Sequence, residues 1–175
     1  MRRKSRPARR LLAAFLAAVA AAGMLAAAQA PILVSAERST ALLPEGDHAQ
    51  VTYEGAVVIT HGAAVIHGDR AVLYMKNQHL DRAVVSGAPA TFIWQPQTGV
   101  PVHGEAAIIT YLAAADTVVF AGRVKVHRES QTLSAAEARY TLKTGTLSAR
   151  GGTGTNPERV HVVIPPAPPA TAPRP

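Results

Sequence analysis

The chain has 175 residues, no cysteine and a formal net charge of +7, from 18 Lys and Arg against 11 Asp and Glu. Because six of the positive charges lie within the first ten residues, the rest of the chain is nearly neutral. These totals exclude a disulfide framework and a thiolate zinc site. They also exclude a nucleic-acid partner, since a phosphate backbone needs clustered Lys and Arg.

The N-terminal segment has the pattern of a secretory signal peptide, a basic start followed by the apolar run "LLAAFLAAVAAAGMLAAAQA". Small residues end that run, and we expect residues 1–28 to be removed by cleavage after Ala28. The stretch from Leu11 to Ala28 has 18 residues, about the shortest length that spans a bilayer. An uncleaved membrane anchor is therefore the alternative. Cleavage predicts a mature protein that works outside the cytoplasm.

Alternation of apolar and polar residues dominates residues 29–166, which we assign to one all-β domain. Clusters of Gly, Pro, Asn and Asp divide this region into short antiparallel strands. We expect the strands at 32–38, 49–60, 63–67, 69–75, 82–87, 90–95, 100–103, 106–112, 117–127, 131–134, 136–142, 146–150 and 159–164. The last residues, 167–175, are rich in Pro and Ala and are predicted to form a disordered tail.

A repeated unit carries a glycine in the middle of a strand: "TYEGAVVIT", "VVSGAPATF" and "VVFAGRVKV". The three glycines are Gly55, Gly87 and Gly122, with spacings of 32 and 35 residues. A glycine inside a strand marks a bulge, a sharp bend or a close approach of another backbone. Bends at the same level of each repeat predict a V-shaped sheet, which is a twisted, open β-jelly roll with a channel between its two sides.

Strand alternation places apolar side chains on the inner face of this channel. Such a face is the packed core of a β-sandwich in the first interpretation, which is the commoner role for any single one of these residues. The two interpretations do not conflict, because a jelly roll whose sheets do not fully close leaves part of its core as a groove for a lipid. We predict the following residues as lipid-binding positions of the inner face: Ile32, Val34, Tyr53, Val57, Ile59, Ile66, Leu73, Phe92, Ile109, Tyr111, Phe120 and Val124.

Several segments resemble the periplasmic lipopolysaccharide-transport bridge family, LptA/OstA-like. They include "VTYEGAVVITHG", "IHGDRAVLY" and "GAPATFIW", and the resemblance covers about residues 31 to 166. The most specific part runs from Val102 to Val126, in the order "V-x-G-x-A…Y…D-x-V-x-x-x-G-x-V". The chain departs from the family pattern at Ala56 and Arg123, where the family prefers Asn after the glycine.

The resemblance implies a periplasmic carrier that shields the lipid A acyl chains of lipopolysaccharide and bridges the two membranes by head-to-tail stacking. The implied partners are the inner-membrane lipopolysaccharide-transport complex and the outer-membrane translocon. Both end segments, "ILVSAERS" and "RVHVVIPP", have high β-propensity and few charges, so we expect partners and further copies to join them by strand addition. The alternatives are a membrane-anchored jelly-roll component of the same pathway and a structural surface module without lipid transfer.

Catalytic and metal chemistry find little support in the sequence. There is no GxSxG elbow, no P-loop and no cysteine nucleophile, so we expect neither an enzyme nor a cofactor. Asp69, Glu105 and Glu137 recur at equivalent places of the repeat, and we interpret them as outer-face residues at strand starts rather than paired catalytic acids. The seven histidines lack the spacing of helical metal motifs, and we interpret most of them as turn residues that hold no metal.

Overall fold

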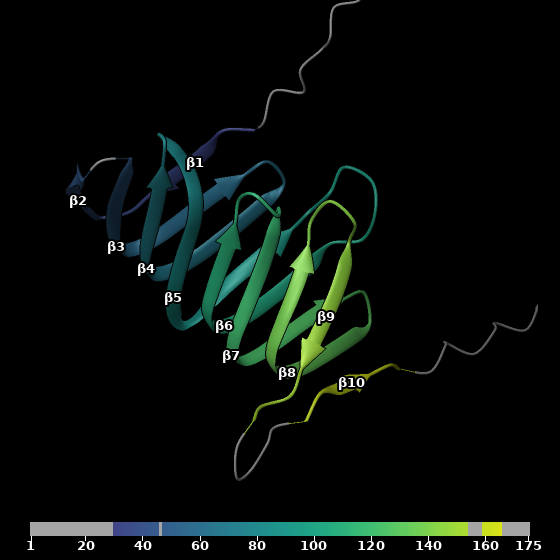
Figure 1. Cartoon of the computed structure of the whole chain (residues 1–175). Coiled ribbons are helices and arrows are strands. Elements are labelled where there is room, and N and C mark those ends of the chain that lie inside the picture. The colour runs from purple at the N-terminus through teal and green to yellow at the C-terminus, as the bar shows by residue number, and fades with distance from the viewer. Residues whose placement is uncertain (1–29, 46, 154–158, 166–175) are drawn as a thin grey trace, which may run out of the picture.

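The computed structural model describes residues 30–45, 47–153 and 159–165 (Figure 1). The predicted signal peptide, 1–28, and the predicted tail, 167–175, lie outside the described residues. In the described part of the chain, no helix has the length and apolarity needed to cross a membrane.

Ten strands form the described part of the chain, and every pairing between them is antiparallel, which confirms the all-β jelly-roll prediction. Neighbouring strands follow one another in space, in the order β1-β3-β4-β5-β6-β7-β8-β10, while β2 pairs with β3 and β9 with β8. The bounds are β1 Ile32–Ser35, β2 Arg38–Glu45, β3 His48–His61, β4 Ala64–Lys76, β5 His79–Trp94, β6 Val102–Leu112, β7 Thr117–Arg128, β8 Gln131–Thr141, β9 Thr146–Arg150 and β10 His161–Val163.

The central strands are longer than the sequence predicts. Strands expected at 63–67 and 69–75 join into β4, and those expected at 82–87 and 90–95 join into β5. The residues that look like strand ends in the sequence lie inside bent strands that keep their hydrogen bonding on both sides of the bend. The sequence reading also missed β2, because its "LPE" residues resemble the turn that follows.

The bends lie side by side across the sheet. The pairing register shifts between Glu54 and Val57 in β3, and it shifts at the corresponding level between β4 and β5, β5 and β6, β6 and β7, and β7 and β8. Gly55 and Gly122 lie at these shifts with φ of 80° and 79°, a conformation that favours glycine. Gly87 also lies at a shift, without a positive φ. The aligned bulges produce the common fold line of the sheet.

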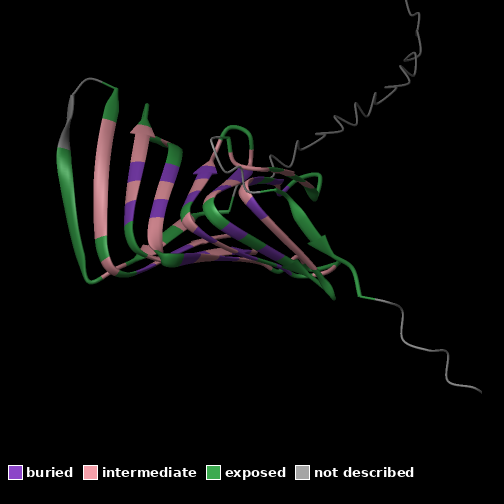
Figure 2. Ribbon diagram, turned by 90° about the horizontal axis from the view of Figure 1, so that it is seen from below, coloured by how far each residue is buried: buried purple, intermediate pink, exposed green. Residues whose placement is uncertain are grey.

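The fold line divides the sheet into two layers, which we call leaf A and leaf B (Figure 2). Leaf A contains β1, β10 and the halves of the central strands that lie between them, such as Val57–His61 of β3. Leaf B contains β2, β9 and the other halves, such as His48–Glu54 of β3. We call the row of neighbouring strands along the fold line the stack, and each bent strand, with one half in each leaf, a rung. At the two ends of the stack the rung consists of two separate short strands, β1 and β2 at the N-terminal end and β10 and β9 at the C-terminal end.

The two leaves pack against each other in the middle and C-terminal part of the stack. Phe92 of leaf A contacts two aromatic rings of leaf B, with ring centroids 5.5 Å from Phe120 and 6.3 Å from Tyr140. Phe92 and Phe120 are fully buried. Gly104 leaves the room that this packing needs, because a Cβ at that position would meet the Phe120 ring. This region is a closed hydrophobic core.

Candidate functional site

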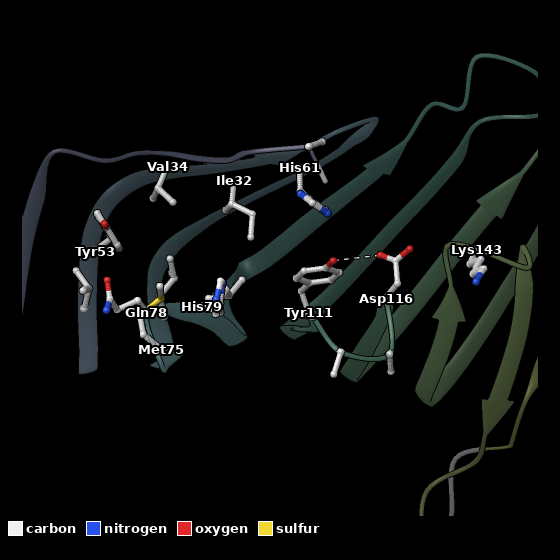
Figure 3. A pocket seen from close by; sticks show the side chains of 17 residues that line it. Ile32, Val34, Tyr53, His61, Met75, Gln78, His79, Tyr111, Asp116 and Lys143 are labelled. Carbon is white, nitrogen blue, oxygen red and sulfur yellow. Dashed lines mark hydrogen bonds between the residues drawn. The ribbon is translucent and has the colours of Figure 1, made fainter. Parts of the chain in front are cut away.

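A cavity of about 900 Å³ lies between the leaves at the N-terminal end of the stack (Figure 3). Ile32 and Val34 of β1 form its wall on leaf A. The wall on leaf B comes from alternate residues of β3 and β4, with the side chains Val51, Tyr53, Leu73 and Met75. The N-terminal rungs thus enclose an apolar space that the protein's own side chains leave open.

Strand pairing explains why these side chains face one another. One inner row of leaf B runs across neighbouring strands from Val51 through Leu73 and Ala83 to Tyr111. On leaf A, Ile32 pairs with His61, and Val34 pairs with Ile59. Because side chains alternate between the two faces of a strand, each of these rows lies on the inner face throughout.

The rim of the cavity is polar. It carries Gln78 from the turn between β4 and β5, His79 from the start of β5, Asp116 from the turn between β6 and β7, and Lys143 from the turn between β8 and β9. His61 of leaf A lies on the opposite side of the cavity from the turn residues of leaf B (Figure 3). An apolar floor with a polar rim is the lining expected of a site for an amphiphile.

Tyr111 and His61 close the cavity toward the core. Their rings come from opposite leaves and lie with centroids 5.4 Å apart. The Tyr111 hydroxyl donates a hydrogen bond of 3.1 Å to Oδ1 of Asp116. Burial raises the pKa of Tyr111 well above its usual value, and the neighbouring Asp116 carboxylate raises it further. Tyr111 is therefore a protonated hydrogen-bond donor at neutral pH.

The predicted inner-face residues fall into two groups in the structure. Five of them line the cavity: Ile32, Val34, Tyr53, Leu73 and Tyr111. Seven of them are buried between the leaves in the closed core: Val57, Ile59, Ile66, Phe92, Ile109, Phe120 and Val124. The role of either group toward a lipid stays a prediction, but only the first group lines the large cavity.

Sequence reasoning missed part of the cavity lining. Val51, Met75 and Leu80 line it, and their apolar alternation with Tyr53 and Leu73 is the signal that marks them. His61 was not predicted as a lining residue, because the glycine that follows it in "THG" indicates a turn. In the structure, His61, His67, His103 and His127 are all strand residues, so the interpretation of most histidines as turn residues is wrong.

The described residues contain no cluster of three side chains of the types that ligate metals. His103 and His127 pair across β6 and β7, but on the exposed outer face. The expectation that the chain holds no metal and no cofactor stays a prediction.

A smaller cavity of about 260 Å³ lies at the C-terminal end of the stack. Its lining includes Val126 and Leu133 of leaf A, Leu147 of leaf B, and Val162 of the end strand β10. The packed aromatic side chains around Phe92 lie between the strands that line the two cavities. The protein therefore has an apolar recess at each end of the stack and a closed core between them.

The fold and the cavity define the class of this protein, an open antiparallel β-jelly roll of the OstA-like kind. The family model described as "LptA/(LptD N-terminal domain) LPS transport protein" matches residues 34–146, well over half of the chain. The chain belongs to this family. The family description names a transport protein, which agrees with the expectation that the chain is not an enzyme.

Comparison with individual proteins gives the same result. The chain is 29% identical over 119 residues to lipopolysaccharide export system protein LptA of Escherichia coli K12, and equally so to that of Shigella flexneri. The alignment covers 67% of this chain and 63% of these relatives, just under two thirds of their length.

A solved structure shares the fold with a TM-score of 0.67 and 24% identity, covering 78% of this chain and 96% of that chain. It is the crystal structure of LptH, the LptA-homologous periplasmic component of the lipopolysaccharide transport device of Pseudomonas aeruginosa.

Proposed function

We propose that this protein is a periplasmic carrier of lipopolysaccharide that holds lipid A acyl chains in the N-terminal cavity. The observation that carries the proposal is the cavity of about 900 Å³ with an apolar floor and a polar rim. Membership of the family and the names of the relatives from E. coli and P. aeruginosa support the substrate and the compartment. The predicted signal peptide supports export.

The cavity suits transport better than catalysis. Each buried methylene group contributes about 0.8 kcal/mol of binding free energy, without a preferred direction. Acyl chains along Ile32, Val34 and Leu73 are therefore held strongly in total, yet they can slide between similar contacts. The sequence shows no nucleotide-binding motif, so an energy source elsewhere drives the direction of transfer.

The ends of the stack favour head-to-tail assembly. At the N-terminal end, β1 and β2 each leave one edge unpaired within the described residues, and β9 and β10 do the same at the C-terminal end. Val162 of β10 pairs with Leu133, which belongs to the same inner row of leaf A as Val34. Pairing β10 of one copy with β1 of the next continues this row and brings the two cavities together.

The same edges are the proposed contacts with the inner-membrane transport complex and the outer-membrane translocon. Exposed apolar residues gather on the end strands, with Leu33 of β1 62% exposed and Val163 of β10 62% exposed. Such edges invite pairing with another strand unless they are blocked.

Binding of purified lipopolysaccharide by the Val34→Asp variant tests the proposed cargo site. A carboxylate in the apolar wall must lose its hydration when acyl chains enter, so we expect binding to fall at least about ten-fold. Leu33→Asp is the matched control, since this neighbour in β1 faces outward. Equal binding by wild type and V34D argues against the cavity as the lipid site.

Self-association and partner pull-down by the Ile32→Asp variant test the edge model. Ile32 lies at the outer rung, where a second copy would join, and a charge there disfavours a buried junction. We expect both self-association and capture of the transport partners to be lost. The edge model is wrong if both remain unchanged.

A further inference from the structure

Basic residues gather around a recess on the outer face of leaf A, at the C-terminal end of the stack. The recess has a volume of about 350 Å³, and its charged lining residues are Arg123, Lys125 and Arg159, with His161 of β10 beside them. Lys125 and His161 lie level with each other on the exposed face, on either side of β8. No Asp or Glu of the described residues lines this basic pocket. Its charge fits an acidic group of a partner.

Arg159 of this pocket and Glu37 lie at the same level of the two opposite ends (Figure 1). Arg159 precedes β10 by two residues and lines the pocket with Arg123, which follows the fold-line glycine Gly122. Glu37 follows β1 by two residues, and its amide donates a hydrogen bond of 3.0 Å to the carbonyl of the fold-line glycine Gly55. Both charged residues are exposed. An acid and a base therefore lie at the fold line, one at each end of the stack.

The register of the sheet brings these two residues together when copies stack. An outer row of leaf A runs level through its strands from Ser35 of β1 to His161 of β10. When β10 of one copy pairs with β1 of the next and this row continues, Ser35 lies opposite His161. The two strands run antiparallel, so the residues two positions nearer the fold line, Glu37 and Arg159, also lie opposite each other.

The other pairs that this register creates match in polarity. Leu33 lies opposite Val163 on the outer face, where both are exposed in the single chain. Val34 lies opposite Val162 on the inner face. A shift of one residue would turn the inner residues of one strand against the outer residues of the other, and a shift of two would separate the two charges. The level register therefore satisfies the apolar and the charged residues together.

We propose that Glu37 of one copy binds in the basic pocket of the neighbouring copy, with Arg159 as its direct partner, and that this ion pair selects the register of head-to-tail stacking. The inference rests on the proposed end-to-end assembly and names the charged contact that orders it. Backbone groups of a strand edge are alike at every residue, so complementary side chains must select one register.

Like charges meet on leaf B at the same junction. Arg38 and Arg150 end one outer row of leaf B, so they lie opposite each other when the rows of two copies continue. Arg150 already donates a hydrogen bond of 2.9 Å to the Glu137 carboxylate, which reduces the repulsion. Among the described residues, neither Glu37 nor Arg159 forms a salt bridge. The attraction across the junction therefore depends on these two residues.

Self-association of two charge-reversal variants, each alone and then mixed, tests the inference. Glu37→Arg puts two bases at the junction and Arg159→Glu puts two acids there, so each variant should self-associate about ten-fold more weakly than wild type in sedimentation velocity. An equimolar mixture of E37R and R159E should recover wild-type association, because each junction between the two variants joins an acid to a base again. Asp69→Arg is the matched control, since Asp69 is exposed but lies inside the stack, in β4, and this variant should associate like wild type.

Unchanged self-association of both single variants overturns the inference and leaves head-to-tail assembly in place, with the basic pocket serving another acidic group. Weak association that mixing does not restore also overturns it, because the two residues then do not face each other. If wild type itself does not self-associate, the proposed assembly fails, and the inference fails with it.

Discussion

The N-terminal end of the interior and its closed middle use the same strand pattern with different results. At the N-terminal end, the inner residues Val34 and Tyr53 are only half-buried and border a cavity. In the closed half, Phe92 and Phe120 occupy the same inner face and are fully buried. Alternation alone makes an inner face, and the sizes of the side chains in the facing rows decide whether that face becomes core or groove.

The change from groove to core occurs at β6. Along one row of leaf B, Val51, Leu73 and Ala83 are followed by Tyr111, which reaches across to leaf A. Beyond Tyr111, aromatic side chains fill the space between the leaves. In the N-terminal rungs, no pair of aromatic rings from the two leaves is in contact ahead of His61 and Tyr111 among the described residues. The leaves therefore leave open space between them there.

The largest expected difference between the open and closed parts of the interior is in the loss of stability when an aromatic side chain is truncated to alanine. Phe120→Ala removes a fully buried ring, and we expect a loss of about 3–5 kcal/mol in the free energy of unfolding. Tyr53→Ala removes a half-buried ring beside existing open space, and we expect a loss of about 1 kcal/mol. Urea unfolding of both variants measures the difference, and equal losses would contradict the division into groove and core.

The fold-line glycines should behave alike in the two halves. Gly55→Ala and Gly122→Ala each place a side chain at φ near +80°, which costs about 1–2 kcal/mol. The added Cβ would also meet the Glu37 side chain at position 55 and the Ala107 Cβ, 3.1 Å away, at position 122. Urea unfolding should therefore show similar losses for both. A much smaller loss for G55A would mean that the open half does not need its bulge.

The residues after those glycines offer a small gain in stability. Ala56 and Arg123 have φ of 43° and 53°, in the left-handed region that Asn tolerates better than other residues with a side chain. We expect Ala56→Asn and Arg123→Asn each to raise the free energy of unfolding by about 0.5 kcal/mol. Thermal unfolding measures the gain, with Ala107→Asn as a control whose φ is not positive. A loss of stability in both variants would contradict this explanation of the family preference.

The sequence was sufficient for the bent all-β fold, since the mid-strand glycines Gly55 and Gly122 and the alternation around them are local signals. It was not sufficient for the extent of the groove. Tyr53 and Phe120 follow the same pattern, and only pairing across both leaves shows that one faces open space and the other faces Phe92. His61 lines the cavity but was not among the predicted site residues. The local sequence, a single histidine before a glycine, does not indicate whether the side chain faces the interior.

Photo-crosslinking in cells that make lipopolysaccharide tests the central claim most directly. A p-benzoylphenylalanine residue replaces Tyr53 in one variant and Phe120 in the other, so that two aromatic positions of the inner face of leaf B are compared. We predict an adduct with lipopolysaccharide from position 53 and none from position 120. An adduct from position 120 with none from position 53 would contradict the assignment of the cargo site to the N-terminal cavity.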